Sequence, residues 1–243
     1  KTDKSDLTTP DTLYLHRSLQ KIKKNNINNA IIETSSHGLH QKRLDHLNFK
    51  AGIFTNFSQD HLDYHKTMAK YLNAKLHLFR NVIKKRRVII CDRTIKEFSL
   101  LKKISKKRKL KLIDSNKIAE KLKKNAQINL NEFQLKNLSM AIQAAKLNGL
   151  RENKIFSSLK KIKDVNGRLE LIRTFSNKVK AYVDFAHTPD ALEKAIKSLQ
   201  NYHGTEITLV FGCGGDRDFK KRPIMAKIAS IYCKKIYVTD DNP

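Results

Sequence analysis

The sequence predicts an α/β fold, and three observations lead to this prediction. Between residues 180 and 239, strand and helix patterns alternate in the order strand, helix, strand, helix, strand. In the first half, the apolar run 51–54 is followed by a polar loop and then by a helical pattern that contains Lys75. Polar residues also gather directly after the predicted strands, where ligands bind in α/β proteins. Because right-handed crossovers make successive strands parallel, we expect the strands of 180–239 to be parallel and to share one polar edge.

The composition is that of a folded chain with a large positive charge. Apolar residues make up 40% of the sequence, enough for the core of one large or two ordinary domains. Fifty Lys and Arg against 23 Asp and Glu give a formal net charge of +27, which suggests a polyanion as a partner. However, aromatic residues are only 7%, so stacking surfaces for single strands are scarce. We therefore favour a general lysine enrichment and expect no specific nucleic acid.

Cysteine usage and hydropathy point to a reducing compartment. Cys91, Cys213 and Cys233 lack C-x-x-C spacing, so neither a disulfide framework nor a zinc site is predicted. No apolar run approaches the roughly 20 residues of a spanning helix, and residues 1–11 lack an apolar signal core. We expect a cytoplasmic protein without a membrane partner, most simply a monomer.

The first polar cluster lies at a predicted helix start. Thr8 and Thr9 precede Pro10 and Asp11 at that start, where a threonine either caps the helix or binds a ligand. Spacing alone favours capping.

A second cluster follows a predicted strand at residues 29–33. The strand ends in the carboxylate of Glu33, and hydroxyl groups and an imidazole come next. Together with His61 in the loop after residue 54, Glu33 could hold a magnesium ion that keeps most of its waters. His61 and His65 are four residues apart, but the zinc motif H-E-x-x-H is absent because Leu62 follows His61.

Lys75 lies on an apolar helix face with Met68, Leu72, Leu76 and Phe79. A lysine in that position snorkels to solvent, loses its charge, or is needed there. From spacing alone, snorkelling is the favoured interpretation.

The remaining elements set the predicted domain organisation. Short strands are predicted at 88–91 and 110–113, and helices at 131–147 and up to about residue 163. We place the boundary where helices end and strands resume, which gives domains 1–165 and 166–243.

The second half carries polar residues after each of its predicted strands, at 184–187, 212–218 and 240–242. The glycines 212, 214 and 215 are similar to a phosphate loop, but Arg217 stands where G-x-G-x-x-G needs a glycine. Arg217 suits a carboxylate or phosphate, or it pairs with its acidic neighbours.

The motifs occur in an order that resembles the Mur ligase family, and within it the UDP-N-acetylmuramoyl-tripeptide synthetases. The resemblance covers nearly the whole chain and rests on the segments Thr8-Thr9-Pro10, Glu33–Leu39, Thr55–His65, Asn73-Ala74-Lys75, Gly167-Arg168, Asp184–Pro189, Gly212–Asp218 and Asp241-Asn242-Pro243.

The resemblance implies a central ATPase-type α/β domain and a Rossmann-like α/β ligase domain, each cut short in what we expect to be an internal fragment. It also implies an ATP-dependent amide ligase that uses Mg²⁺ and proceeds through an acyl phosphate. Such an enzyme adds the third residue of the stem peptide to UDP-MurNAc-L-Ala-D-Glu in peptidoglycan synthesis. We expect this residue to be meso-diaminopimelate rather than L-lysine.

Site residues follow from the resemblance position by position. The UDP-MurNAc dipeptide would be held by Thr8, Thr9, Ser35, Gln41 and Arg43. Magnesium would be bound by Glu33 and His61, which act with Lys75, the lysine that is carbamylated in the family. ATP would be bound by Asn137, Arg168, Asp184 and His187. The incoming amino acid would be bound by Arg217, Asp241 and Asn242.

The sequence departs from the family pattern at several points. The glycine-rich ATP loop expected before Thr8 is missing, so we expect the 243 residues alone not to turn over ATP. Gln134 stands where the family usually has Asn beside adenine, and Leu7 where Asn commonly precedes the threonines. The residue that distinguishes diaminopimelate enzymes from lysine enzymes comes after Pro243. The alternatives are another Mur or folylpolyglutamate-type ligase and, in a different class, a basic RNA-binding protein.

Overall fold

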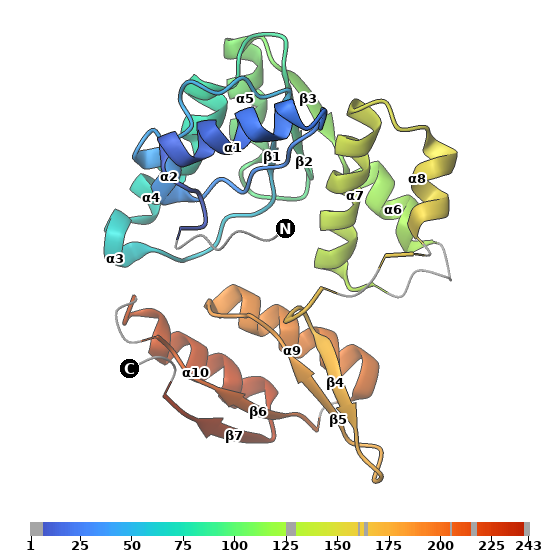
Figure 1. Cartoon of the computed structure of the whole chain (residues 1–243). Coiled ribbons are helices and arrows are strands. Elements are labelled where there is room, and N and C mark those ends of the chain that lie inside the picture. The colour runs from blue at the N-terminus through green and yellow to red at the C-terminus, as the bar shows by residue number, and fades with distance from the viewer. Residues whose placement is uncertain are drawn as a thin grey trace. The chain divides into compact units, whose positions relative to one another are not determined.

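The chain forms two compact units (Figure 1). The computed structural model describes residues 7–124, 130–159, 161–162, 165–204, 206–214 and 218–240. Unit 1 consists of Lys1–Phe57 and Thr67–Asn148, and unit 2 of Ser58–Lys66 and Gly149–Pro243. The chain therefore leaves unit 1 at residue 58 and returns to it at residue 67. No helix in the described ranges is long and apolar enough to cross a bilayer.

Unit 1 is built on a three-stranded parallel sheet. Its strands β1 (Ala51–Phe54), β2 (Val88–Cys91) and β3 (Lys111–Asp114) pair in that order. The register aligns Phe54 with Cys91 and Cys91 with Asp114, so the three strands end at the same level. The loops that follow them start from one edge of the sheet, as ligand-binding loops do in this class of fold.

Helices cover both faces of this sheet because side chains alternate along β2. Ile89 points into a core that includes Leu76 and Phe79, whereas Ile90 and Val88 pack with Met140 on the other face. The helices of unit 1 are α1 (Thr12–Lys24), α2 (Ser36–His40), α4 (Met68–His77) with the π-helical turn η1 (Leu78–Val82), α5 (Phe98–Arg108), α6 (Asn116–Lys123) and α7 (Glu132–Leu147).

Unit 2 has two small sheets and a smaller core. Its strands are β4 (Glu170–Thr174) and β5 (Lys180–Val183), which are antiparallel, and β6 (Thr208–Phe211) and β7 (Lys235–Val238), which are parallel. Its helices are α3 (Leu62–His65), α8 (Glu152–Leu159), α9 (Pro189–His203) and α10 (Lys221–Tyr232). The buried core residues Leu192 and Ile196 of α9 pack with Met225 of α10.

Most predicted elements are confirmed. The apolar runs 51–54 and 88–91 form β1 and β2, and the strand predicted at 110–113 is β3, one residue later. The helix predicted at 131–147 is α7; a capping box between Asn131 and Gln134 fixes its start. The α/β fold class is likewise confirmed.

The strand predicted at 29–33 is wrong. Residues 27–35 form no helix or strand, and the Ile31 side chain is 98% exposed. Within the described part of the chain, no neighbouring strand pairs with this segment, and apolar residues alone do not make a strand without such a partner. The helix start after Thr8 is confirmed, but its capping residue is Asp11, whose side chain accepts from the Tyr14 N–H.

Of the strands predicted to be parallel within 180–239, β6 and β7 are parallel, as expected, whereas β5 does not pair with them in the described part of the chain. β5 pairs antiparallel with β4, a strand that the sequence analysis missed. The two form a hairpin whose turn is closed by a hydrogen bond from Phe175 N–H to the Val179 carbonyl, with Lys178 at a φ of 65°. β4 was hard to detect because four of its five residues are exposed. The boundary predicted near residues 164–167 falls within unit 2 and, as a statement about domains, stays a prediction.

Candidate functional site

Thr9 is the centre of a buried hydrogen-bond network in unit 1. Its side chain has no exposed surface. The hydroxyl donates to the Glu33 carbonyl at 2.9 Å and accepts from the Ser35 N–H at 2.8 Å. Gly38 of α2 lies so close that a Cβ there would be 2.8 Å from the Thr9 Cβ. Thr9 thus attaches the segment before α1 to residues 33–35, which lead into α2.

Three more predicted substrate residues belong to the same network. Arg43 donates through Nη1 to the Thr9 carbonyl at 2.5 Å and through Nη2 to the Gln41 side-chain oxygen. The Ser35 hydroxyl accepts from the Gly38 N–H at 3.1 Å and caps α2. Thr8, the fifth residue of the predicted set, is exposed beside Thr9. The structure therefore brings Thr9, Ser35, Gln41 and Arg43 into direct contact.

Lys75 is half-buried between two aromatic rings of unit 1. Its Nζ lies 5.5 Å from the ring centroid of Phe54 and 5.5 Å from that of Tyr71. The faces of both rings carry partial negative charge, so they favour the ammonium form of the lysine. Leu76 and Phe79 of the predicted apolar face are buried, as expected.

Glu33 and Asn137 are exposed in unit 1. Gln134, which stands where the family usually has an adenine-contacting Asn, uses its side-chain oxygen to accept from the Asn131 N–H at 3.1 Å. Gln134 therefore has a structural role in capping α7, and the sequence signal for it is the N-x-x-Q spacing of a capping box.

A buried carboxylate at the end of β2 was missed by sequence reasoning. Asp92 has no exposed surface, and its Oδ1 accepts from the Thr94 N–H at 2.8 Å and the Thr94 hydroxyl at 2.6 Å. Its Oδ2 has no hydrogen-bond partner in the parts of the chain that are described. Burial, with the charges of Asp114 and Asp92, raises the pKa of the Cys91 thiol to about 12, so this cysteine stays protonated.

In unit 2, the carboxylate of Asp184 shapes the loop after β5. It accepts from the Ala186 N–H at 2.9 Å and from the Leu169 N–H at 2.8 Å. The guanidinium of Arg168 lies 5.2 Å from the ring centroid of Phe185. Three predicted ATP residues, Arg168, Asp184 and His187, are thereby gathered on two adjoining loops.

His187 is held at both ring nitrogens. Nδ1 lies 3.0 Å from the Phe185 carbonyl, and Nε2 lies 3.3 Å from Oδ2 of Asp60. A carbonyl and an ionised carboxylate only accept, so this arrangement favours the ring form in which both nitrogens donate, which is positively charged. The pKa of His187 is accordingly raised, mainly by the hydrogen bond to Asp60, although burial and the charge of Lys221 act in the opposite direction.

Asp60 is a second residue that sequence reasoning missed. Its Oδ1 accepts from the His61 N–H at 2.9 Å, and its Oδ2 lies 3.3 Å from Nε2 of His61 as well as from His187. Burial raises the pKa of Asp60, but the hydrogen bond with His187 and the charges of both histidines outweigh burial and lower it overall. His61 itself has a φ of 55°, in the left-handed region that few residues adopt.

Magnesium is an incomplete fit to the residues described. Within the described ranges, no group of three or more His, Cys, Asp or Glu could hold a metal ion. Magnesium needs only one or two carboxylates besides water and phosphate oxygens, and the exposed Glu33 meets that requirement. His61 would have to turn its Nε2 away from Asp60 to take part.

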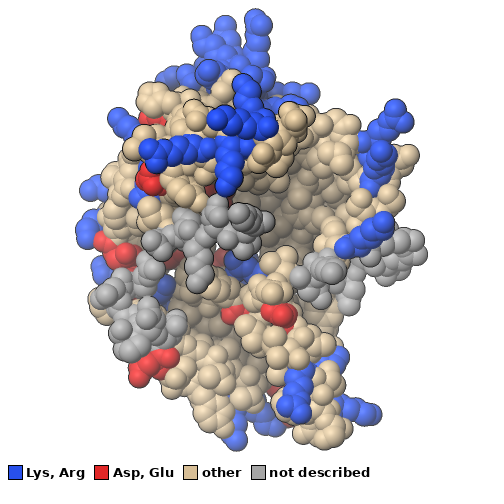
Figure 2. All heavy atoms as spheres, viewed as in Figure 1, with Lys and Arg blue, Asp and Glu red and all other residues tan. Residues whose placement is uncertain are grey.

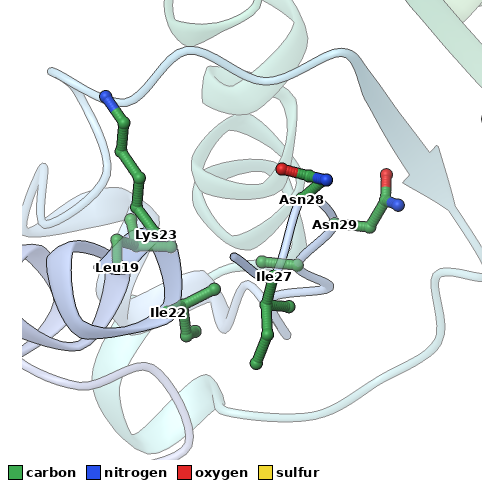
Figure 3. A pocket seen from close by; sticks show the side chains of 7 residues that line it. Leu19, Ile22, Lys23, Ile27, Asn28 and Asn29 are labelled. Atoms are coloured by element: carbon green, nitrogen blue, oxygen red, sulfur yellow. The ribbon is translucent and has the colours of Figure 1, made fainter. Parts of the chain in front are cut away.

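Two cavities lie at strand or helix ends. One, of about 390 Å³, opens at the carboxyl ends of β6 and β7 and includes Gly212, Arg222 and Asp240 in its lining. Arg222 donates to the Gly214 carbonyl at 3.2 Å there. The predicted amino-acid residues Arg217, Asp241 and Asn242 lie outside the described residues. The second cavity, of about 330 Å³, lies between α1 and the segment 27–30, and none of the predicted site residues lines it (Figure 3).

On the face shown in Figure 2, Lys and Arg side chains crowd at the upper end and stand in smaller groups elsewhere, with uncharged surface and some Asp and Glu between these groups. On this face they form no single continuous stripe. A dispersed pattern favours general lysine enrichment over a nucleic-acid track.

Comparisons with known proteins agree with these observations. Residues 1–149 match the Mur ligase middle domain, and residues 167–243 match the Mur ligase glutamate ligase domain. A UDP-N-acetylmuramoyl-L-alanyl-D-glutamate–2,6-diaminopimelate ligase of Rickettsia bellii is 38% identical over 98% of this chain and 54% of the relative. The ligase of the same name from Brucella melitensis is 36% identical over 100% of this chain and 54% of its own length. The chain thus spans about half the length of the curated relatives it matches.

Solved structures give the same result. The solved structure of a ligase with that name is 29% identical to this chain and has a TM-score of 0.63. The match covers 96% of this chain and 52% of the solved chain. A folylpolyglutamate synthase from Mycobacterium tuberculosis, at 15% identity over 81% of this chain and 49% of its own, with a TM-score of 0.57, is similar in fold alone.

Proposed function

The chain belongs to the Mur ligase family, and on that premise we propose that it carries binding parts of an ATP-dependent amide ligase. The proposed reaction adds meso-diaminopimelate, in preference to L-lysine, to UDP-MurNAc-L-Ala-D-Glu. ATP phosphorylates the free carboxylate of the dipeptide, the amine of the incoming residue attacks the acyl phosphate, and inorganic phosphate leaves.

The observation that carries this proposal is the similarity to diaminopimelate ligases along the whole chain. Relatives of that name are 35–38% identical over at least 98% of it. The geometry supports the assignment, because polar residues of each unit gather and are fixed by hydrogen bonds: around Thr9 in unit 1, and in the loop after β5 in unit 2.

In unit 1, we assign the UDP-MurNAc dipeptide to Thr8, Gln41 and Arg43 as direct contacts. Thr9 and Ser35 belong to the same site, but their hydroxyls are bonded to backbone groups. They support the site by holding the backbone around it.

Lys75, Glu33 and His61 form the proposed catalytic set. Magnesium held by Glu33 and His61 would supply positive charge beside the phosphates of ATP. Carbamylation of Lys75 requires the neutral amine, whereas the rings of Phe54 and Tyr71 favour the ammonium. A nearby cation would therefore be needed to stabilise the carbamate, and ¹³C-labelled bicarbonate followed by ¹³C NMR would detect it at Lys75.

We assign ATP binding in unit 2 to Arg168, Asp184 and His187 and, separately, in unit 1 to Asn137. Arg168 and His187 supply positive charge, and Asp184 sets the shape of the loops that carry them. The amino-acid site is assigned to Arg217, Asp241 and Asn242, which lie outside the described residues.

The test measures ADP release by the protein made from the complete open reading frame that encodes this sequence. We expect turnover only when UDP-MurNAc-L-Ala-D-Glu and a diamino acid are both present, and a higher kcat/KM for meso-diaminopimelate than for L-lysine. ATP turnover without the amino acid would contradict the proposal.

An Arg43→Ala variant sharpens the test. It should raise the KM for the UDP precursor about 10- to 100-fold, as loss of a charged contact does. Arg17→Ala, at an exposed position on α1, is the matched control and should leave that KM unchanged.

Two other functions are distinguished by the same protein. A folylpolyglutamate-type ligase would use a folate and glutamate in place of the UDP precursor. A basic RNA-binding protein would bind RNA tightly with a steep salt dependence, whereas the proposed ligase should show only weak, salt-sensitive retention.

A further inference from the structure

The segment Ser58–Lys66 is joined to the rest of unit 2 by two side-chain contacts. Nε2 of Gln59 donates to Oδ2 of Asp218 at 3.1 Å, and Oδ2 of Asp60 pairs with Nε2 of His187 at 3.3 Å. Both acceptors are shielded: Asp218 is 6% exposed, and the Asp60 side chain is 15% exposed. Partly buried, charged contacts of this kind are stronger than exposed ion pairs.

The carboxylate of Asp60 is itself oriented by its own backbone. Oδ1 accepts from the His61 N–H, which leaves Oδ2 facing the histidine rings. The unusual left-handed φ of His61 accompanies this arrangement. A residue held in a sparsely populated conformation needs support from its surroundings, and such residues concentrate at functional sites.

Among the described residues, Asp60 is the hydrogen-bond partner given for Nε2 of the His187 ring. The side chain is 53% exposed, and its remaining contacts are the Phe185 carbonyl at Nδ1 and the edge of the Phe185 ring at a centroid distance of 5.5 Å. Without Asp60, rotation about χ2 and exchange of the ring with water would cost little. Asp60 therefore decides where the Nε2 side of the ring points.

We propose that Asp60 is a positioning residue for His187: its carboxylate fixes the ring in the orientation that the proposed ATP site uses. The inference rests on the proposed function, since that function assigns His187 to ATP. In this role Asp60 acts through His187, although the same carboxylate oxygen also lies 3.3 Å from Nε2 of His61.

The bond itself is tested by NMR on the 243-residue chain with ¹⁵N-labelled histidine. In the unsubstituted chain, the Hε2 proton of His187 should be protected from exchange with water. Asp60→Ala should remove this signal, and Asp60→Asn, whose amide oxygen still accepts, should retain it in part. Asp63→Ala is the matched control, because Asp63 is an exposed acid of the same segment. If the signal survives Asp60→Ala, the proposal is wrong.

The role is tested by kinetics with the protein from the complete open reading frame. Asp60→Ala should lower kcat/KM for ATP about 10- to 100-fold and leave the KM for the UDP precursor within about twofold. His187→Ala should have a similar effect, and the double variant should be no worse than either single one, because coupled residues are not additive. A purely structural role would change the KM of both substrates and lower the thermal midpoint.

The outcomes separate the inference from the proposed function. Ligase activity with multiplicative effects of the two substitutions would overturn the positioning role alone. Absence of any ligase activity in the unsubstituted protein would overturn the proposed function, and with it the ATP role, while the NMR result would still decide whether Asp60 orients the ring.

Discussion

The Thr9 network in unit 1 and the His187 loop in unit 2 rest on different kinds of support. Thr9 is completely buried and lies beside a core to which α1, α2, α4 and α5 all contribute. The His187 loop follows a strand whose last residue, Val183, is 50% exposed, and its Phe185 is 66% exposed. It is held mainly by the carboxylates of Asp184 and Asp60. Burial therefore stabilises the first site, and charged hydrogen bonds stabilise the second.

The two units should differ most in the free energy of unfolding that is lost when an aromatic residue is replaced. Phe79→Ala removes a side chain that is 1% exposed from the core of unit 1 and should cost about 3–5 kcal/mol. Phe185→Ala in unit 2 should cost about 1 kcal/mol or less, because it loses chiefly the contact with Arg168. Urea unfolding followed by circular dichroism measures both. Equal costs would contradict the comparison.

The next effect is expected at Thr9. Thr9→Val keeps the shape of the side chain but leaves the Ser35 N–H and the Glu33 carbonyl without their partner, at a cost of about 1–3 kcal/mol. Thr8→Val, at the exposed neighbour, should stay within about 0.5 kcal/mol. Thermal unfolding of the two variants tests this, and a silent Thr9→Val would mean that the network contributes nothing.

In unit 2, loss of a charged acceptor should act locally. Asp184→Ala removes the acceptor of the Leu169 and Ala186 amides and should cost about 1–2 kcal/mol. We expect faster hydrogen exchange at those two amides and little change in the Thr9 network. Exchange that rises equally in both units would show that the loop is not an independent element.

The smallest effect is a pH dependence confined to unit 2. The raised pKa of His187 means that its contribution to stability is complete below the unfolded value of about 6.5 and is lost as pH rises through the folded value. The lowered pKa of Asp60 means that its contribution is present above 3.8 and is lost as pH falls through the folded value. The pair should therefore stabilise most between those limits.

We expect this contribution to stay below about 1 kcal/mol, because the His187 side chain is half-exposed and solvent screens the pair. The groups that act on His187 are Asp60 and the charge of Lys221, and His61 pairs with the same Asp60 carboxylate. Hydrogen exchange of residues 184–187 between pH 6 and pH 9 measures the effect, with Asp60→Asn as the variant in which it should disappear. A similar pH response around Thr9 would contradict the comparison, since neither Thr9 nor Ser35 titrates in that range.

The sequence predicts the strands and helices of unit 1 better than those of unit 2. Continuous apolar runs such as 88–91 indicate buried parallel strands, and the helical spacing of apolar residues over 131–147 predicts α7. β4 was missed because an exposed strand carries little apolar periodicity. Residues 29–33 are the opposite case: they have the apolar pattern of a strand but form none. In the described part of the chain, no neighbouring strand pairs with them.

The residues of the candidate site, too, could be predicted from the sequence only in part. Family motifs identify His187 and Asp184 in the sequence, and the hydrogen bonds of Asp184 then explain why an aspartate stands there. Asp60 could not be linked to His187 in advance, because the two are far apart in sequence and no periodicity relates them. Asp92 belongs to no recognisable sequence motif, and only the structure shows that it is completely buried.

The excursion of Ser58–Lys66 also determines how this protein can be dissected. The chain passes from one unit to the other three times, at residues 57/58, 66/67 and 148/149, so a single cut cannot separate the units. A piece starting at Gly149 would retain Asp218 but lose the amide of Gln59 that binds it. To study unit 2 by itself, residues 58–66 would have to be grafted back onto it as an added segment.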